Sequence, residues 1–500
     1  MVDSNSFPHP KSGKIPYKWI ALSNTTLGTV LASLDTNIIF IALPVISSDL
    51  NISLNTMVWI VIGYSLVTAS ILLNFGRLSD IFGRTKLYTL GFAIFTLGSA
   101  LCSFSETGEQ LIIFRIIQAI GAAFIFSNSV AILTDAFPVN ERGKALGINQ
   151  VAIMLGSVLG LVLGGFLTSY FGWRSIFWIN IPIGVVGIFF SYTNLKEIGS
   201  FKREKIDWLG NISFATGLFF ILISITFGSF GILSNFNSLI LLFFGGFSLM
   251  IVFPLIEKYV SSGYPLFDFS LFKIKPFLGG NIAILLNSIA RGDFILLISF
   301  YLQSEFMHFT PLEVGIYFIP VSITIAIFGP LSGALSDKYG PRFFSGLGLF
   351  LSGLGFILLT QLDLKSSFID LLFPFLLLGT GMGIFSSPNR SSIMNSVPAN
   401  RRGVSASTGT TLFYIGRSLS IGLSFLVMVS FLPTDQVKEI IYDFENNDLS
   451  SYNQAKDKAN FSDEIRSTKF LDAIHVIFLV SAIIVFVAII PATTKGNLKQ

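Results

Sequence analysis

The chain has 500 residues, of which 52% are hydrophobic and only 12% are charged. A soluble domain usually carries about 25% charged residues, so this composition excludes a water-soluble fold. Apolar runs of about twenty residues, each long enough to cross a bilayer as a helix, recur along nearly the whole length. The sequence therefore predicts an all-α polytopic membrane protein. The single cysteine, Cys102, excludes an intrachain disulfide, and the three histidines are too dispersed for a zinc cluster.

The apolar runs predict fourteen membrane spans. They lie near residues 19–46, 56–75, 87–105, 109–133, 145–170, 173–194, 208–228, 236–256, 276–303, 312–335, 343–361, 367–392, 404–431 and 469–491.

The distribution of lysine and arginine predicts the orientation. The segments that follow the even-numbered spans are basic, and they include Arg84, Lys196, Lys338, Arg390 and Arg401. Cytoplasmic loops are enriched in Lys and Arg, so both termini are expected in the cytoplasm, with the protein in the plasma membrane.

One predicted outer loop, residues 433–468, is long, polar and mixed in charge. Long loops are often functional or disordered. We expect a small helical or disordered external cap, with a partner-docking module as the alternative.

Two charged segments are near-copies of each other, which predicts a duplicated bundle. Residues 76–84 (GRLSDIFGR) and 333–342 (GALSDKYGPR) share Gly, Leu, Ser, Asp and Gly in the same order. Internal repeats are typical of secondary transporters. Each segment follows the second span of a six-span half. Residues 1–195 and 261–500 are therefore expected to form two bundles, and residues 196–260 a linker with an inserted two-helix hairpin.

Each copy resembles the cytoplasmic loop signature of the major facilitator superfamily, G-x-L-x-D-x-x-G-R. The resemblance implies two six-helix bundles that rock against each other, with the charged turns as gates. The glycines permit a tight turn, and the aspartate can cap the next helix or accept a bond from an arginine. The alternative is a solvated turn without a gating role. The predicted gating residues are Gly76, Asp80, Gly83, Arg84, Gly333, Asp337, Gly340 and Arg342.

Further motifs resemble those of the fourteen-span drug:proton antiporters, a family of multidrug resistance exporters. Residues 34–44 resemble L-D-x-T-I-V-N-x-A-L-P, residues 115–123 resemble R-x-x-Q-G-x-G-A, and residues 173–184 match W-R-x-I-F-x-I-N-x-P-I-G. The resemblance covers nearly the whole chain in the right order and implies proton-coupled export. Two departures are Phe40, where the signature has Asn, and Ala119, where it has Gly. Phe40 enlarges an aromatic surface that could suit a lipophilic substrate, or it packs against lipid.

Two ionisable residues stand out in the first half. Asp35 lies about sixteen residues past Trp19, or ~24 Å along a helix. A carboxylate inside a membrane tends to be functional, so we expect Asp35 to carry the coupling proton or to bind a cation. The alternative is a structural carboxylate bonded to Asn24 or Asn37. Arg115 is expected to pair with an acid and tune it, or else to snorkel to the outer interface.

Three charged residues stand out in the second half. Arg291 and Asp293 lie in span nine and Arg417 in span thirteen. Residues two apart on a helix do not face each other, so Arg291 and Asp293 are expected to have different partners. Asp293 is a second candidate for proton or cation binding. Arg417 is expected to pair with Asp293 or with a substrate anion, and structural pairing is the alternative for all three residues.

Span five carries small residues four apart, which allow close helix packing. The spacing resembles the antiporter signature G-x8-G-x3-G-P-x2-G-G. Leu161 occupies the proline position, which weakens the expected kink. The predicted packing residues are Gly156, Gly160, Gly164 and Gly165.

Two function hypotheses follow. No nucleotide-binding loop and no catalytic cluster are visible, so neither an ATP-driven pump nor an enzyme is expected, and the proton gradient rather than a cofactor would supply the energy. The first hypothesis is proton-coupled export of lipophilic, cationic drugs by a monomer, with the substrate, protons and lipid as partners and no nucleic acid.

The alternative is a carrier or exporter of a small metabolite, including an anionic one, with Arg291 and Arg417 as direct ligands. The sign of the charge that lines the central cavity discriminates between these two hypotheses. A non-transporting receptor or scaffold is a third class, against which the charged residues at midplane argue.

The predicted topology has a direct test. A reporter fused to the C-terminus is expected to read cytoplasmic, because an even number of spans returns the chain to the side of the N-terminus. An external signal from that reporter would contradict the topology.

Overall fold

The computed structural model describes residues 16–138, 141–198, 208–229, 236–259, 269–398, 401–433, 436–437, 440 and 449–493. Twelve helical spans in this part are long and apolar enough to cross a membrane. The predicted all-α polytopic architecture is confirmed.

The first half is a six-span bundle. Its sixth span is broken into the short α6 and the longer α7, and α1 packs against α4 and α5 while α3 packs against α4 and α7. The helices are α1 (Tyr17–Asp49), α2 (Leu54–Phe82), α3 (Arg84–Ser103), α4 (Gly108–Ala136), α5 (Arg142–Phe171), α6 (Ser175–Trp178) and α7 (Asn180–Asn194).

The second half has the same plan, with two broken spans. The pairs α10/α11 and α12/α13 each form one span, and α15 packs against α13 and α14 while α10 packs against α16 and α18. The elements are the short 3-10 helix η1 (Leu271–Lys273), α10 (Lys275–Arg291), α11 (Phe294–Gln303), α12 (Pro311–Tyr317), α13 (Ile319–Tyr339), α14 (Pro341–Leu359), α15 (Phe368–Ser396), α16 (Arg402–Phe431) and α18 (Leu449–Ala492).

The predicted hairpin is present as α8 (Trp208–Ser229) and α9 (Phe236–Tyr259), which pack against each other. Its apolar stretches among the described residues, Ile212–Ile225 and Leu241–Leu255, are shorter than the other spans. Besides α9, α8 contacts α2 of the first half and α16 of the second, so the hairpin lies along a seam between the bundles.

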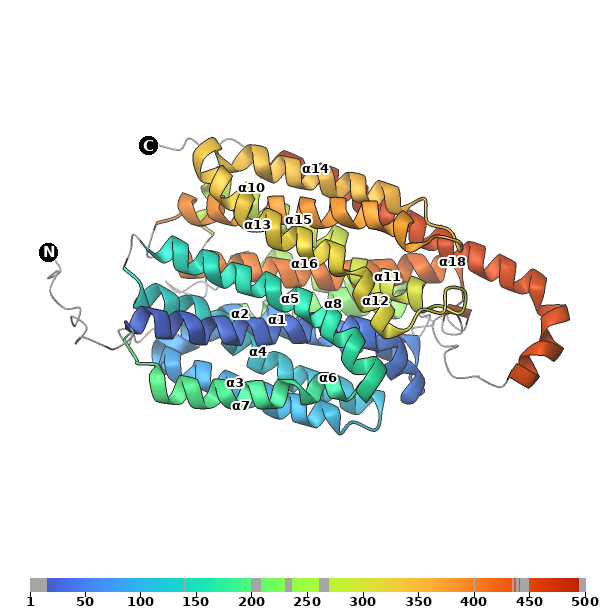
Figure 1. Cartoon of the computed structure of the whole chain (residues 1–500). Helices are drawn as coiled ribbons and strands as arrows, with labels where there is room; N and C mark the ends of the chain where they lie inside the picture. Colours follow the sequence, from blue (N-terminus) through green and yellow to red (C-terminus); the bar gives the residue numbers. More distant parts are fainter. Residues whose placement is uncertain are drawn as a thin grey trace, which may run out of the picture.

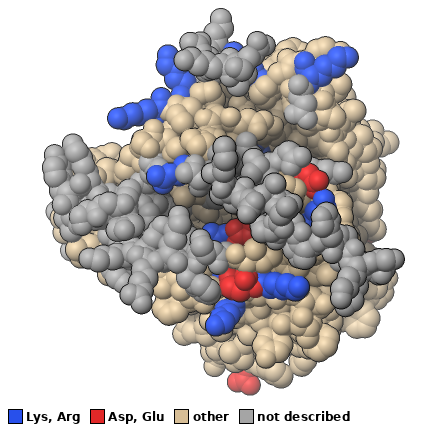
Figure 2. Space-filling view, turned by 90° about the vertical axis from the view of Figure 1, so that its left-hand side faces the viewer, with Lys and Arg blue, Asp and Glu red and all other residues tan. Residues whose placement is uncertain are grey.

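The helices run between two ends of an elongated molecule (Figure 1). The start of α1 and the end of α18 lie at the same end, which we call the inner end. Basic side chains are spread over this end, with acidic ones between them (Figure 2). At the opposite, outer end, α18 begins at Leu449, so much of the polar segment 433–468 is helical.

The two repeated segments are more helical than predicted. Helix α2 continues to Phe82 and α13 to Tyr339, and each ends at a glycine with positive φ, Gly83 at 104° and Gly340 at 90°. Only these two glycines make the reversal into the next helix, because L side chains rarely adopt such φ values. Gly76, Asp80 and Asp337 are described only as parts of these helices, and the surroundings of Gly76 and the side chains of the two aspartates lie outside the description.

Three of the four predicted packing glycines hold α5 against α1. A Cβ added at Gly156, Gly160 or Gly164 would lie 2.6, 2.5 or 2.9 Å from the carbonyl oxygen of Val30, Leu34 or Ile38. These glycines follow one face of α5 at intervals of four residues, as close helix packing requires. Gly165 does not belong to this contact.

We expect Gly160→Ala to destabilise the bundle by about 1–3 kcal/mol, because the added methyl group forces two backbones apart. Gly147→Ala is the matched control: it lies in the same helix and has nothing within 4 Å of its added Cβ. That change should be neutral or stabilising, since Ala is the better helix former. Thermal unfolding in detergent measures both. Equal unfolding temperatures for the two variants would contradict the close α1–α5 contact.

Candidate functional site

A cavity of about 260 Å³ lies between the two halves. Helices α1, α4 and α5 line it from the first half, and α10, α11, α13, α15 and α16 line it from the second. Small-molecule sites are concave clefts of this general size, mostly apolar with a few placed polar groups. The cavity is therefore the candidate substrate site.

The outer end of the cavity is closed by contacts between the halves. Gln303 donates a hydrogen bond to the Ile41 carbonyl oxygen at 3.1 Å, and the Leu312 amide donates to Ser169 at 2.9 Å. Gly165 belongs here, since its added Cβ would lie 2.4 Å from the Pro311 carbonyl oxygen.

The lining residues, by contrast, extend towards the inner end. They include Asn149 near the start of α5, Arg390 near the end of α15 and Gly409 near the start of α16. With the contacts at the outer end closed, the cavity lies nearer the end that holds the start of α1 and the end of α18.

All charged side chains among the described cavity residues are arginines: Arg291, Arg390 and Arg417. No acidic residue is among them. Arg417 Nη2 donates to the Thr36 carbonyl oxygen at 2.8 Å, and its guanidinium lies 4.6 Å from the centre of the Phe40 ring. Arg291 lies 6.0 Å from the Phe413 ring centre. The cavity is therefore positively charged.

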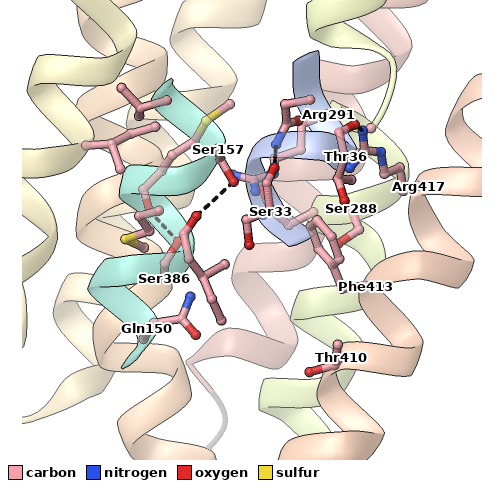
Figure 3. Close-up of a pocket in the computed structure, with 18 of the residues that line it drawn as sticks. Ser33, Thr36, Gln150, Ser157, Ser288, Arg291, Ser386, Thr410, Phe413 and Arg417 are labelled. Atoms are coloured by element: carbon pink, nitrogen blue, oxygen red, sulfur yellow. Dashed lines mark hydrogen bonds between the residues drawn. The ribbon is translucent and has the colours of Figure 1, made fainter. Parts of the chain in front are cut away.

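The remaining lining combines aromatic rings with small polar groups. Figure 3 shows Arg291 and Arg417 near one end of the view with Thr36 and Ser288, and Gln150 and Thr410 near the other end. The aromatic residues are Phe40, Phe126, Phe294, Phe318, Phe385, Phe413 and Tyr414. The uncharged polar residues are Thr29, Ser33, Thr36, Asn37, Asn149, Gln150, Ser157, Asn287, Ser288, Ser322, Ser386, Asn389 and Thr410. Such a lining can stack a planar ring system and bond its polar edges.

Asp35 and Arg115 form a buried ion pair outside the cavity lining. Arg115 Nη1 donates to Asp35 Oδ2 at 2.6 Å, and the side chains are 1% and 0% exposed. Gln118 and Asn180 each donate to Asp35 Oδ1 at 2.8 Å. Arg115 also lies over the Tyr64 ring, 4.2 Å from its centre. The pair belongs entirely to the first half.

The structure decides between the alternatives at four residues. Asp35 is bonded to neither Asn24 nor Asn37, and Arg115 is buried rather than snorkelling, because α1, α3, α4 and α7 enclose the pair. Arg417 does not pair with Asp293: it crosses to α1 instead. Phe40 is 1% exposed and faces the cavity, not lipid.

Asp293 and Arg291 have different partners, as their spacing predicts. Asp293 lies at the break between α10 and α11, where its amide donates to Ser420 at 3.1 Å and its carboxyl group is bonded to Ser424. Gly292 and Phe294 on either side line the cavity, whereas Asp293 is not among the lining residues.

The sequence analysis missed Arg390, which it assigned to a basic inner loop. The predicted span ends at residue 392, whereas the helix continues to Ser396, and the Arg390 side chain lines the cavity. It also missed Gln118 and Asn180 as ligands of Asp35. Both lie in the quoted motifs, but sequence gives no sign that the motifs meet in space.

Among the predicted gating residues, Arg84 has a defined partner. Its Nη1 donates to Asp135 Oδ2 at 2.6 Å, and its backbone amide donates to Glu197 at 2.8 Å. In the second copy, an added Cβ at Gly333 would lie 2.5 Å from the Ser387 hydroxyl. These described contacts lie within one half, and a gating role for them stays a prediction.

Two six-span bundles around a central cavity that is closed at one end define a secondary membrane transporter. The model of the Major Facilitator Superfamily matches residues 25–421, so the chain belongs to this family. The predicted fold is confirmed.

Relatives include transporters with different named substrates. The chain is 33% identical over 83% of its length to the riboflavin transporter RibZ of Clostridioides difficile (strain 630), covering 88% of that protein. It is 28% identical over 79% of its length to multidrug resistance protein 3 of Bacillus subtilis (strain 168), covering 76% of it. The resemblance to multidrug resistance exporters is thereby confirmed.

The fold is also that of a solved transporter. The inward-facing, unoccupied crystal structure of a bacterial homologue of the human lysosomal transporter Spinster matches 96% of this chain and 98% of its own, with a TM-score of 0.63 and 17% identity.

We expect Arg115→Leu to destabilise the protein by about 3–5 kcal/mol, because it leaves a buried carboxylate without its cation. Glu141→Gln is the control, since the Lys18–Glu141 pair is 28% and 38% exposed and an exposed pair contributes about 0–1 kcal/mol. Thermal unfolding of the purified variants measures the difference. Asp35→Asn combined with Arg115→Leu should recover part of the loss, and equal stability of Arg115→Leu and the control would contradict the buried pair.

Proposed function

We propose that the protein is a secondary transporter of bulky aromatic molecules that carry a negative charge or an equivalent set of hydrogen-bond acceptors. The observation that carries this proposal is the cavity charge: three arginines and, among the described lining residues, no acid. A buried arginine favours a partner with acceptor oxygens, such as a carboxylate or phosphate. The lining thus supports the metabolite alternative over lipophilic cations, which it repels.

The aromatic part of the proposal has separate support. Rings from both halves surround the cavity, and ring faces stack on planar ligands. A relative at 33% identity is named a riboflavin transporter, and riboflavin is a planar, acceptor-rich molecule. We infer a substrate of that general shape.

Export of drugs is the second candidate function. It is favoured by the relatives named for multidrug resistance and by one from Streptomyces glaucescens named for tetracenomycin C resistance and export, 25% identical over 84% of this chain. Uncharged or acidic aromatic drugs suit the cavity as well as a metabolite does.

The mechanism would be alternating access in the plasma membrane. Rocking of the halves would open the α5–α12 and α1–α11 contacts at the outer end and close the cavity at the inner end. A proton gradient rather than a cofactor would drive it, in a monomer with both termini in the cytoplasm.

Three fluorescent probes test the charge preference in proteoliposomes. Riboflavin and flavin mononucleotide share one ring system and differ in a phosphate group, and ethidium is an aromatic cation. We expect saturable transport of at least one flavin and none of ethidium. Transport of ethidium in preference to both flavins would overturn the proposal.

Arg291→Gln should weaken binding of the transported flavin by about 10-fold or more, because a hydrogen bond to a charged group contributes about 1.5–3 kcal/mol. Lys338→Gln is the control: it removes the same charge from an exposed position outside the cavity. Fluorescence titration measures both. Equal affinities for the two variants would exclude Arg291 as a substrate ligand.

A further inference from the structure

Asp293 is a buried carboxyl group without a cation partner. Its side chain is 2% exposed, and its Oδ1 atom has no hydrogen-bond partner among the described residues. Its other oxygen, Oδ2, is bonded to the Ser424 hydroxyl of α16. None of the ion pairs in the described part of the chain includes Asp293.

Counting protons at Ser424 indicates the protonation state of Asp293. Ser424 Oγ lies within bonding distance of Asp293 Oδ2 and also 2.9 Å from the Ser420 carbonyl oxygen. The hydroxyl has one proton, and a carbonyl oxygen can only accept. A protonated Asp293 satisfies both contacts, because its O–H donates to Ser424 while Ser424 donates to Ser420.

Asp35 shows the opposite arrangement. Its oxygens receive bonds from the Arg115 guanidinium and from the Gln118 and Asn180 amides. Each of these groups is a donor, so Asp35 is held as the charged carboxylate. The two buried aspartates are therefore chemically different, and Asp293 is the one arranged to hold a proton.

The elements packed against Asp293 carry other titratable or charged groups. None of them makes a described hydrogen bond or ion pair with its carboxyl group. They include Arg291 on α10, Tyr301 on α11, Tyr414 and Arg417 on α16, Asp370 and Arg390 on α15, Asp35 on α1, and Arg466, Lys469, Asp472 and His475 on α18.

The backbone of α16 at Arg417 packs closely against Gly292, the residue that precedes Asp293. A Cβ added at Gly292 would lie 2.7 Å from the Arg417 Cα atom. In this conformation the Arg417 side chain reaches across to the Thr36 carbonyl oxygen in the other half, at 2.8 Å. The hydrogen bond from Arg417 to Thr36 therefore joins the two bundles, and the residue that donates it lies beside Asp293.

We propose that Asp293, at the break between α10 and α11, is the site of the coupling proton, and that its ionisation controls the bond between Arg417 and Thr36. When the O–H bond of Asp293 breaks, the proton passes to water in the cavity beside Gly292 and Phe294 and leaves a carboxylate. That carboxylate attracts the Arg417 guanidinium away from Thr36 and loosens the contact between the halves. This assignment rests on the proposed transport function, and it moves the coupling proton from Asp35 to Asp293.

A proton fits this site better than a metal cation. A buried metal ion needs several oxygen ligands at once. Here the carboxyl group is bonded to the Ser424 hydroxyl, which also donates to the Ser420 carbonyl oxygen, and the Ser420 hydroxyl accepts from the Asp293 backbone amide.

Infrared difference spectroscopy of the reconstituted protein across a pH series tests the site without any substrate. We expect a band from a protonated carboxyl group that disappears as the pH rises. It should be absent in Asp293→Asn and present in Asp363→Asn, which removes an exposed carboxyl group. Ser424→Ala should keep the band but shift it, because the hydrogen bond is lost. If Asp293→Asn does not fold, the shift of the band in Ser424→Ala tests the assignment instead.

Transport assays separate this proposal from the proposed function. Exchange of the transported flavin across equal pH does not need a net proton movement, whereas accumulation against a gradient does. Both processes need the halves to separate, and an asparagine at position 293 cannot ionise to free Arg417 from Thr36. In Asp293→Asn we therefore expect flavin binding to remain, and both exchange and pH-driven accumulation to fall to those of protein-free liposomes. If the wild type shows no exchange, the proposed substrate class is wrong, and the infrared result still stands by itself.

Three outcomes would overturn the assignment. The titrating band could persist in Asp293→Asn, or Na⁺ at fixed pH could remove it, which would make the site a metal-cation site. Retained pH-driven accumulation in Asp293→Asn would also place the coupling proton elsewhere.

Discussion

Polar groups inside this bundle have little water to bind, and that constraint organises the structure. An isolated charge in a low-dielectric interior is strongly unfavourable unless it is paired or neutralised. The two buried aspartates meet the requirement in different ways: Asp35 with a cation and two amides, and Asp293 with the hydroxyl group of Ser424. The chemistry available to each residue follows from its partners.

Helix α5 makes two kinds of close glycine contact, one within the first half and one between the two halves. Glycines on α5 bring that helix against α1 within the first half, and Gly165 brings it against Pro311 in the second half. The first contact is internal to a bundle and would stay intact in the proposed rocking of the halves. The second contact closes the outer end of the cavity. Helix α5 therefore stabilises the first half and also takes part in the contact between the halves.

The proposed substrate class rests on the charge of the cavity and not on a sequence motif. The antiporter motifs contribute Asp35, Arg115, Gln118 and Asn180, which meet inside the first half and away from the cavity. Thr36, Asn37 and Phe40 of the first motif do line the cavity, but its charged residues, Arg291, Arg390 and Arg417, lie outside the motifs. The positive charge of the cavity therefore comes from residues outside the motifs shared with exporters.

The sequence by itself determined the membrane class, the duplicated halves, the inserted hairpin and the family, because apolar periodicity, repeats and motifs are properties of the linear chain. It also singled out the ionisable residues within spans. Only the tertiary structure decided their partners: Arg417 with Thr36 rather than Asp293, Arg115 with Asp35, and Arg390 in the cavity rather than a loop. Pairing depends on which helix faces cross in space, and positions as far apart as 36 and 417 carry no local signal of that crossing.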